Sequence, residues 1–204
     1  MKFKMSSVPV LFVLCLACGV AVGLAPAAAA KEVPGAPLDH VSIHVSSISK
    51  DTPVRVQAFP STDASMGHAK KAAHQEQAKR MMKESPGLLL NSLVSKLEAA
   101  GFSDVAVLEA GAEAPSDAYV IEGEFTVLHP GSQQERIWFG LGAGKSKTCI
   151  AGKVTQGGKT LADFQNCRVG VTWTKSEHQI EEDATETGAN ITGFMHHWAE
   201  GDYK

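Results

Sequence analysis

Residues 147–168, KTCIAGKVTQGGKTLADFQNCR, have the sequence pattern of a β-hairpin. Two runs rich in strand-forming residues flank the dipeptide Gly157-Gly158, which is typical of a tight hairpin turn. A hairpin centred on this turn brings Cys149 and Cys167 opposite each other to within about one residue of register. We therefore predict a structural disulfide between them, because the close Cys-x-x-Cys spacing of redox-active pairs is absent.

The strand pattern continues upstream of the hairpin. Residues 119–128 place Tyr119 and Ile121 on one face of a strand and Glu122 and Glu124 on the other, and a turn over 129–132 follows. The predicted strands are 40–48, 54–59, 105–108, 119–128, 136–141, 147–155 and 160–168, and 169–173 is compatible with an extension of the last one.

Helical patterns lie between and after these strands. Residues 64–84 are rich in Ala, Lys, Gln, Glu and Met, which favours an exposed helix lying loosely on the domain. Ser85-Pro86 predicts the start of a second helix, with Ser85 as its N-cap, and Gly101-Phe102 predicts its end. Residues 175–188 are acidic and polar and predict a mobile loop, and 190–198 predict a short closing helix.

These elements predict an α+β fold, an antiparallel or mixed β-sheet of about five to six strands with two to three helices packed on one face. We expect a single domain over residues 39–204, preceded by a flexible tether over 31–38 that contains Pro34, Gly35 and Pro37. The length left after residue 30 is sufficient for one hydrophobic core.

The first thirty residues have the pattern of a secretory signal peptide. Lys2 and Lys4 precede an uncharged run over 8–24, and an alanine-rich segment predicts cleavage after Ala30. A retained membrane anchor and lipidation at Cys18 are the alternatives, although the run is short for a membrane span and the residues before Cys18 depart from a lipoprotein signal. We therefore expect an exported protein of the periplasm or cell envelope.

The charge, cysteine content and hydropathy of the chain exclude some partners and structures. The chain has a formal net charge of -3, and removal of two signal lysines makes the remainder more acidic, so nucleic acid is an unfavourable partner. Cys15 and Cys18 lie within the signal, which leaves Cys149 and Cys167 as one pair in an oxidising compartment. No other uncharged stretch approaches the length of a membrane span.

Several of these segments together resemble a known family. The Ser85-Pro86 helix, its Gly101-Phe102 end, the strand VIEGEF over 120–125 and the run GLGAGKS over 140–146 are similar to the bacterial envelope family catalogued as domain of unknown function 4410. The resemblance covers residues 54–168 and implies no established reaction. More distantly, the order of elements is similar to periplasmic domains of outer-membrane accessory lipoproteins, which is an analogy of fold alone.

The glycine-rich run superficially resembles a nucleotide-binding loop. A phosphate-binding P-loop needs a glycine five residues before Gly144, where this chain has Phe139, and it needs a helix next, where residues 147–150 have a strand pattern. We interpret Gly140, Gly142 and Gly144 as a structural turn between strands and expect no nucleotide or other cofactor.

The remaining chemical groups do not assemble into a recognisable active site. None of the histidine spacings is that of a preformed metal site, and no Gly-x-Ser-x-Gly motif is present. Glu122 and Glu124 lie ~7 Å apart on one strand face, so a periplasmic hydrolase using Glu and His residues is the alternative function.

We predict a non-enzymatic envelope accessory or binding protein whose partner is a protein, lipid or glycan. A deep polar pocket that unites Glu122 or Glu124 with a histidine would favour the hydrolase. A shallow apolar patch near Met81, Met82 or Trp198 would favour the binding protein.

Overall fold

A computed structural model describes residues 35–67, 72–131, 145–170 and 176–203, with backbone alone at 73 and 176–178. Its six-stranded sheet has the order β1-β6-β5-β4-β2-β3. The strands are β1 (His40–Ile43), β2 (Val54–Gln57), β3 (Val105–Leu108), β4 (Tyr119–His129), β5 (Lys147–Gln156) and β6 (Lys159–Val169). β2 is parallel to both β3 and β4, whereas the other neighbouring strands are antiparallel, so the sheet is mixed.

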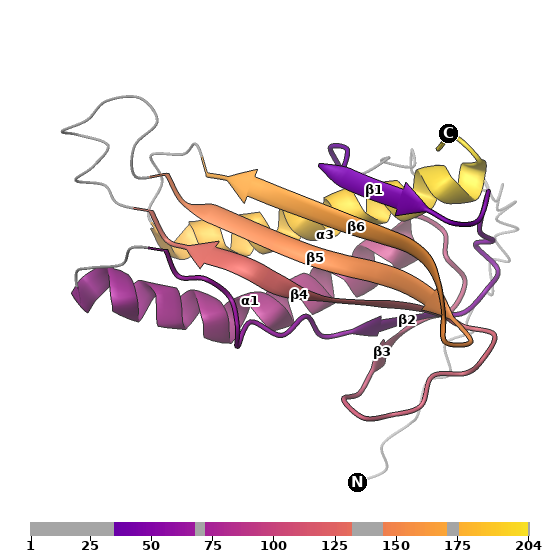
Figure 1. Ribbon diagram of the computed structural model, residues 1–204, viewed down its shortest axis with the longest axis horizontal. Helices are drawn as coiled ribbons and strands as arrows, with labels where there is room; N and C mark the ends of the chain where they lie inside the picture. The colour runs from indigo at the N-terminus through magenta and orange to yellow at the C-terminus, as the bar shows by residue number, and fades with distance from the viewer. Residues whose placement is uncertain (1–34, 68–71, 132–144, 171–175, 204) are drawn as a thin grey trace, which may run out of the picture. The chain divides into compact units, whose positions relative to one another are not determined.

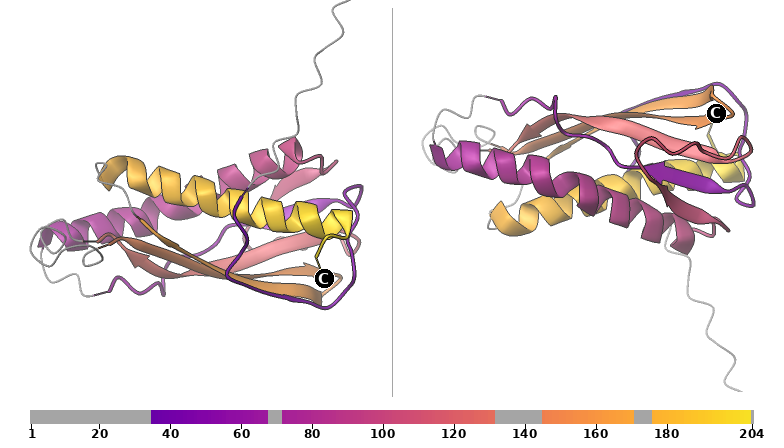
Figure 2. Two further views of the ribbon diagram at one scale, coloured as in Figure 1. Left: turned by 90° about the horizontal axis from the view of Figure 1, so that it is seen from above. Right: turned by 90° about the horizontal axis from the view of Figure 1, so that it is seen from below.

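Two long helices, α1 (Ala72–Ala99) and α3 (Ser176–Glu200), lie side by side on the same face of the sheet (Figures 1 and 2). α1 contacts β2, β3 and β4, and α3 contacts β6. In Figure 1 the sheet lies in front of the helices, and no described segment crosses its opposite face. The predicted α+β fold, with a mixed sheet and helices on one face, is therefore confirmed.

The core lies between the helices and the sheet. Every second residue of β4, β5 and β6 points towards the helices, and most of these residues are apolar. Phe194 of α3 packs between Phe164 of β6 and Trp198, with ring centroids 6.1 and 5.4 Å apart. Trp198 is fully buried and donates a hydrogen bond from Nε1 to the Val45 carbonyl oxygen over 3.0 Å. This contact joins the end of α3 to the segment that follows β1.

The β5–β6 hairpin forms as its sequence predicts. Cys149 and Cys167 are direct Cα partners in the strand register, and a disulfide joins them. Gly157 and Gly158 both adopt positive φ at the turn, which glycine tolerates better than residues with a Cβ. A register shift between Val154 and Thr155 reconciles this turn with the paired cysteines.

The predicted break at Ser85-Pro86 is wrong, because α1 runs through both residues without ending. Proline has no backbone N–H, so Pro86 leaves the Met82 carbonyl, four residues earlier, without its helical donor. The hydroxyl of Ser61 donates to that carbonyl over 2.6 Å. A side chain from the segment after β2 therefore restores the missing bond, and the N-cap assigned to Ser85 is an interior helical position.

The mobile loop predicted over 175–188 is also wrong, since residues 176–188 form the first half of α3. Its buried positions recur at helical spacing, but several of them are polar or small: Gln179, Asp183, Thr187 and Gly188. Binary hydrophobic patterning therefore misses this half of the helix. The closing helix predicted over 190–198 is its second half.

One further prediction differs in length, and three others lie outside the described residues. β1 ends at Ile43, whereas the alternation predicts a strand to residue 48. The predicted strand over 136–141, the signal cleavage after Ala30 and the structural turn at Gly140, Gly142 and Gly144 fall on residues that the structure does not describe. Within the described ranges, no helix has the length and apolar character to cross a bilayer.

Candidate binding groove on the open face of the sheet

The sheet face opposite the helices, which we call the open face, carries a row of charged side chains. Glu122 on β4 pairs in register with Lys153 on β5, and Lys153 pairs with Asp163 on β6. Lys153 Nζ lies 3.5 Å from Glu122 Oε1, and the Asp163 carboxylate lies 3.0 Å from His44 Nε2. Charges of alternating sign therefore cross three strands in the middle of the open face.

A second row lies two residues further along the same strands. Glu124 pairs with Ala151, Ala151 pairs with Gln165, and Gln165 pairs with His40 at the β1 edge. The methyl group of Ala151 leaves space between its larger neighbours. Glu124 is exposed, and its carboxylate has no ion-pair partner among the residues described.

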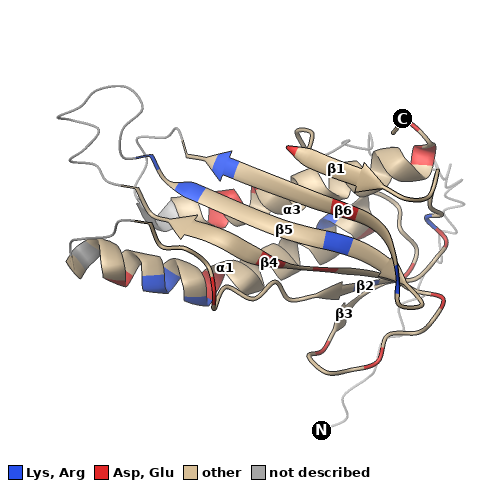
Figure 3. Ribbon diagram, viewed as in Figure 1, with Lys and Arg blue, Asp and Glu red and all other residues tan. Residues whose placement is uncertain are grey.

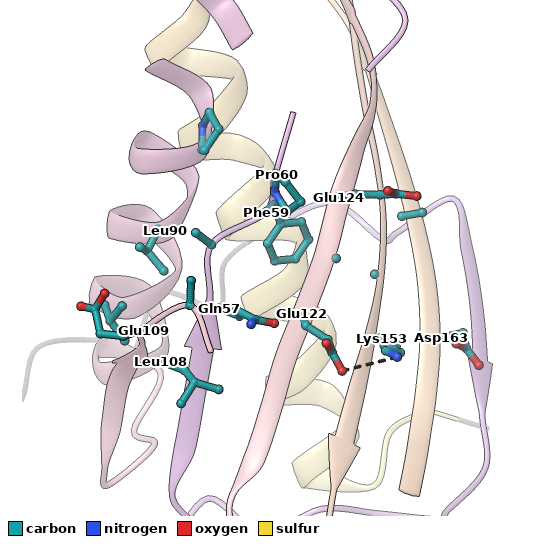
Figure 4. A pocket seen from close by; sticks show the side chains of 17 residues that line it. Gln57, Phe59, Pro60, Leu90, Leu108, Glu109, Glu122, Glu124, Lys153 and Asp163 are labelled. Carbon is teal, nitrogen blue, oxygen red and sulfur yellow. Dashed lines mark ion pairs between the residues drawn. The ribbon is translucent and has the colours of Figure 1, made fainter. Parts of the chain in front are cut away.

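A groove of about 890 Å³ runs from this charged area towards α1 and β3 (Figure 4). At its far end Leu90 and Leu108 form an apolar shelf, with Glu109 beside it, whereas Pro60 lies nearer β4. A smaller hollow of about 330 Å³ adjoins the groove over β1, β5 and β6 and shares Ala151, Gly152 and Asp163 with it. The lining of the groove comprises Gln57, Ala58, Phe59, Pro60, Pro86, Leu90, Val107, Leu108, Glu109, Ala110, Glu122, Gly123, Glu124, Ala151, Gly152, Lys153 and Asp163.

Two paired glycines allow the strands that form the floor of the groove to pack closely against core side chains. Gly123 and Gly152 are Cα partners in β4 and β5. A Cβ on Gly123 would lie 2.4 Å from the Phe59 ring, and a Cβ on Gly152 would lie 2.5 Å from the Phe164 ring. The glycines let these core rings press against the strands from the helix side. Glu122 and Glu124 therefore stand on a strand that the core supports from below.

The groove is acidic overall. Among the described residues, its lining contains the carboxylates of Glu109, Glu122, Glu124 and Asp163 and one ammonium, that of Lys153, an excess of three negative charges. Figure 3 shows acidic positions on β4 and β6 on either side of the basic position on β5. Such a surface attracts cations and repels anions.

Residues 43–174, well over half of the chain, match the family model described as domain of unknown function (DUF4410). The chain belongs to this family. The predicted resemblance is thereby confirmed, over a segment somewhat longer than residues 54–168. No curated protein matches the sequence.

The solved structures that match this chain are distant in sequence. A PelC dodecamer from Paraburkholderia phytofirmans is 13% identical, with a TM-score of 0.44, and the match covers 74% of this chain and 96% of that one. Protein XCC0632 from Xanthomonas campestris, assigned to DUF330, is 12% identical with a TM-score of 0.44, covering 81% and 95%. A neuraminyllactose-binding hemagglutinin homologue from Helicobacter pylori is 15% identical with a TM-score of 0.33, covering 82% and 98%.

The groove of this DUF4410 chain lacks the combination expected for the hydrolase. Glu122 and Glu124 both line it, but none of its described lining residues is a histidine. Glu122 is engaged with Lys153, and His44 is engaged with Asp163 across the sheet. The apolar patch expected for a binding protein is absent as well, because Met81 and Trp198 are buried in the core and Met82 is half-buried.

A second polar cluster lies under α3 and is largely buried, with Arg168 partly exposed at its margin. The Thr148 hydroxyl donates to Asp183 over 3.1 Å, and Arg168 Nε lies 3.4 Å from the same carboxylate. Burial raises the pKa of Asp183, and the hydrogen bond from Thr148 and the charge of Arg168 oppose this shift in part. Gln179 and Ser146 form a further buried hydrogen bond nearby. This cluster attaches α3 to the sheet.

A third cluster joins the loop before β2 to the end of α3. Lys50 Nζ donates to His196 Nδ1 over 2.9 Å and also pairs with Glu200. Burial lowers the pKa of His196, and the neighbouring ammonium of Lys50 lowers it further. No group of three or more potential metal ligands occurs in the described part of the chain.

The sequence identified some of these residues and missed others. The disulfide pair was predicted from hairpin register, and Glu122 and Glu124 were recognised as neighbours on one strand face. Lys153, Asp163 and Glu109 were missed, because their convergence depends on the order of strands in the sheet. The alternating charges of Glu122, Lys153 and Asp163 on three consecutive antiparallel strands would have been the available signal.

Proposed function

We propose that this chain is an exported envelope protein that binds a partner on the open face of its sheet and catalyses no reaction. The observation that carries the proposal is the asymmetry of the sheet. Its helix face is filled by the core, whereas its open face presents a charged groove of about 890 Å³, within the usual size range of ligand sites. Two charged groups in the groove already form an ion pair, which suits recognition better than proton transfer.

Export is supported by independent features of the chain. Residues 1–30 have a basic, apolar and small-residue pattern typical of a cleaved signal. A disulfide between neighbouring strands suits an oxidising compartment such as the periplasm. N-terminal sequencing of the protein recovered from cells tests this part of the proposal. A start at Lys31 would support cleavage after Ala30, and a blocked start at Cys18 would indicate a lipid anchor instead.

Site-directed photo-cross-linking in intact cells tests the binding surface. A photoreactive residue is placed at Gln165, which is exposed on the open face, and at Lys159, which is exposed at the β5–β6 turn, as the matched control. We expect a reproducible envelope adduct from Gln165 and none from Lys159. Equal adducts from both positions, or none from Gln165, would contradict binding on the open face.

A further inference from the structure

We propose that the groove binds an extended segment of a partner protein that carries lysine or arginine side chains and at least one apolar side chain. This inference rests on the proposed binding function and specifies its ligand. It follows from three properties of the groove: its charge, the spacing of its carboxylates and the position of its apolar shelf.

The charge of the lining selects among the ligand classes. A lipid acyl chain would cover Glu122, Lys153 and Asp163 and remove them from water, which is costly, and an anionic headgroup would be repelled by the excess carboxylates. A glycan would lack an aromatic platform, because Phe59 is the only aromatic side chain in the described lining of this groove and is 1% exposed. A cationic polypeptide meets neither obstacle.

The spacing of the carboxylates suits an extended chain. Glu122 and Glu124 lie on the same side of β4, and alternate residues of a strand are ~7 Å apart. An extended peptide running along β4 presents its own alternate side chains at the same interval. Glu124 is the stronger anchor of the two, because its carboxylate is exposed and lacks an ion-pair partner within the described ranges, whereas Glu122 is shared with Lys153.

The shape of the groove accommodates the rest of such a segment. The space over Ala151 lies beside Glu124 and can receive the aliphatic stem of a lysine or arginine while its charged end pairs with the carboxylate. Further along, the shelf of Leu90 and Leu108 offers an apolar surface next to Glu109. An apolar side chain of the segment would therefore rest on this shelf.

Fluorescence anisotropy with the purified full chain tests the inference. The probes are three sets of labelled nine-residue peptides that alternate leucine with lysine, with glutamate or with serine, together with anionic phospholipid vesicles and neutral oligosaccharides. We expect the lysine set to bind, the other probes to bind weakly or not at all, and binding to weaken as salt rises. Preferential binding of the glutamate peptides, the vesicles or the oligosaccharides would overturn the inference.

Three variants show whether Glu124 carries the recognition. Glu124→Gln should weaken binding of the lysine peptides about threefold or more, and Glu124→Lys should abolish it. Glu113→Gln removes an exposed carboxylate that does not line the groove and should leave binding unchanged. Equal thermal unfolding of the three variants shows that folding is intact. Equal binding by Glu124→Gln and Glu113→Gln would refute this site.

The two proposals fail in different ways. If Gln165 yields an envelope adduct in cells and no lysine peptide binds, the open face is a binding surface and the cationic ligand class is wrong. If neither occurs, both proposals are wrong.

Discussion

The hydroxyl of Ser61 donates a hydrogen bond to the Met82 carbonyl oxygen, the acceptor that Pro86 leaves without a donor inside α1. The bond connects the segment after β2 to the middle of a helix more than twenty residues away in sequence. Pro60 and Pro86 both line the groove, and the bond joins the residue after Pro60 to the residue one helical turn before Pro86. Ser61 is buried, which protects the bond from competition by water.

We expect Ser61→Ala to lower the free energy of unfolding by ~1–3 kcal/mol, because it leaves a carbonyl with neither a protein donor nor ready access to water. Urea denaturation measures the change. In a Pro86→Ala background the new N–H at position 86 can donate to Met82, so the same substitution should cost less there. An identical cost in both backgrounds would show that the hydroxyl does not compensate for the proline.

Loss of the disulfide should lower stability by ~3 kcal/mol in the loop-entropy model, since the bond encloses a loop with a sequence separation of 18 residues. The double substitution Cys149→Ser with Cys167→Ser is compared with the parent by thermal unfolding, with and without a reductant. Reductant should destabilise the parent and leave the double variant unchanged. Intact mass without reduction should be two hydrogen atoms lower than after reduction, and free thiols in the unreduced protein would contradict the bond.

The lowered pKa of His196 predicts a loss of stability in mild acid. The unfolded chain binds a proton near the ordinary value of 6.5, whereas burial and Lys50 keep His196 neutral in the folded state to lower pH. The contribution of His196 to the free energy of unfolding is therefore fully present above about pH 6.5 and declines as pH falls towards the pKa of His196 in the folded state. Thermal unfolding of the parent and of His196→Gln from pH 8 to 5 measures it. The variant should lose stability less steeply, with His74→Gln, on α1, behaving like the parent.

The raised pKa of Asp183 predicts the opposite dependence of stability on pH. Its pKa is raised above 3.8 by burial, so its contribution is greatest below that value and declines as pH rises through the folded pKa. Asp183→Asn keeps an acceptor for Thr148 and removes the ionisation. We expect its free energy of unfolding, relative to the parent, to increase between pH 4 and 7. A relative decrease over that interval would show that the ion pair with Arg168 outweighs burial.

Two helical glycines should respond in opposite directions to alanine. A Cβ at Gly188 on α3 would lie 2.4 Å from Ser92 Oγ and 2.9 Å from Ser92 Cβ on α1, whereas nothing lies within 4 Å of a Cβ at Gly87. Gly87→Ala should stabilise the protein by ~0.5–1 kcal/mol through helix propensity. Gly188→Ala should destabilise it by ~1–3 kcal/mol, because the helices must separate. A gain at both positions in urea denaturation would contradict close packing of α1 against α3.

Local sequence patterns correctly predicted those parts of the fold that depend on interactions between residues close in sequence. Turn chemistry at Gly157-Gly158 and strand alternation predicted the hairpin, its register and its disulfide, because all three depend on neighbouring residues. The helix break predicted at Ser85-Pro86 was wrong because the hydrogen bond that compensates for Pro86 comes from Ser61, which is distant in sequence. The first half of α3 was missed because buried Gln179, Asp183 and Thr187 look like surface residues until the sheet supplies their partners.

The candidate site was less predictable than the fold. Glu122 and Glu124 share a strand face, which alternation reveals, but the remaining lining comes from α1, β3, β5 and β6. Their meeting depends on the strand order β6-β5-β4-β2-β3, in which β2 inserts between β4 and β3. Tertiary arrangement, and no local signal, therefore brings Leu90 and Asp163 to the same groove.

The placement of α3 means that the folding unit of this chain extends beyond its family signature. The matched residues end at 174, and α3 begins at Ser176. Yet α3 supplies Phe194 and Trp198 to the core and covers the helix side of β6. A fragment cut at the end of the signature would leave that side of the sheet uncovered and prone to aggregate. Boundaries chosen for expressing or comparing such chains should therefore include this helix.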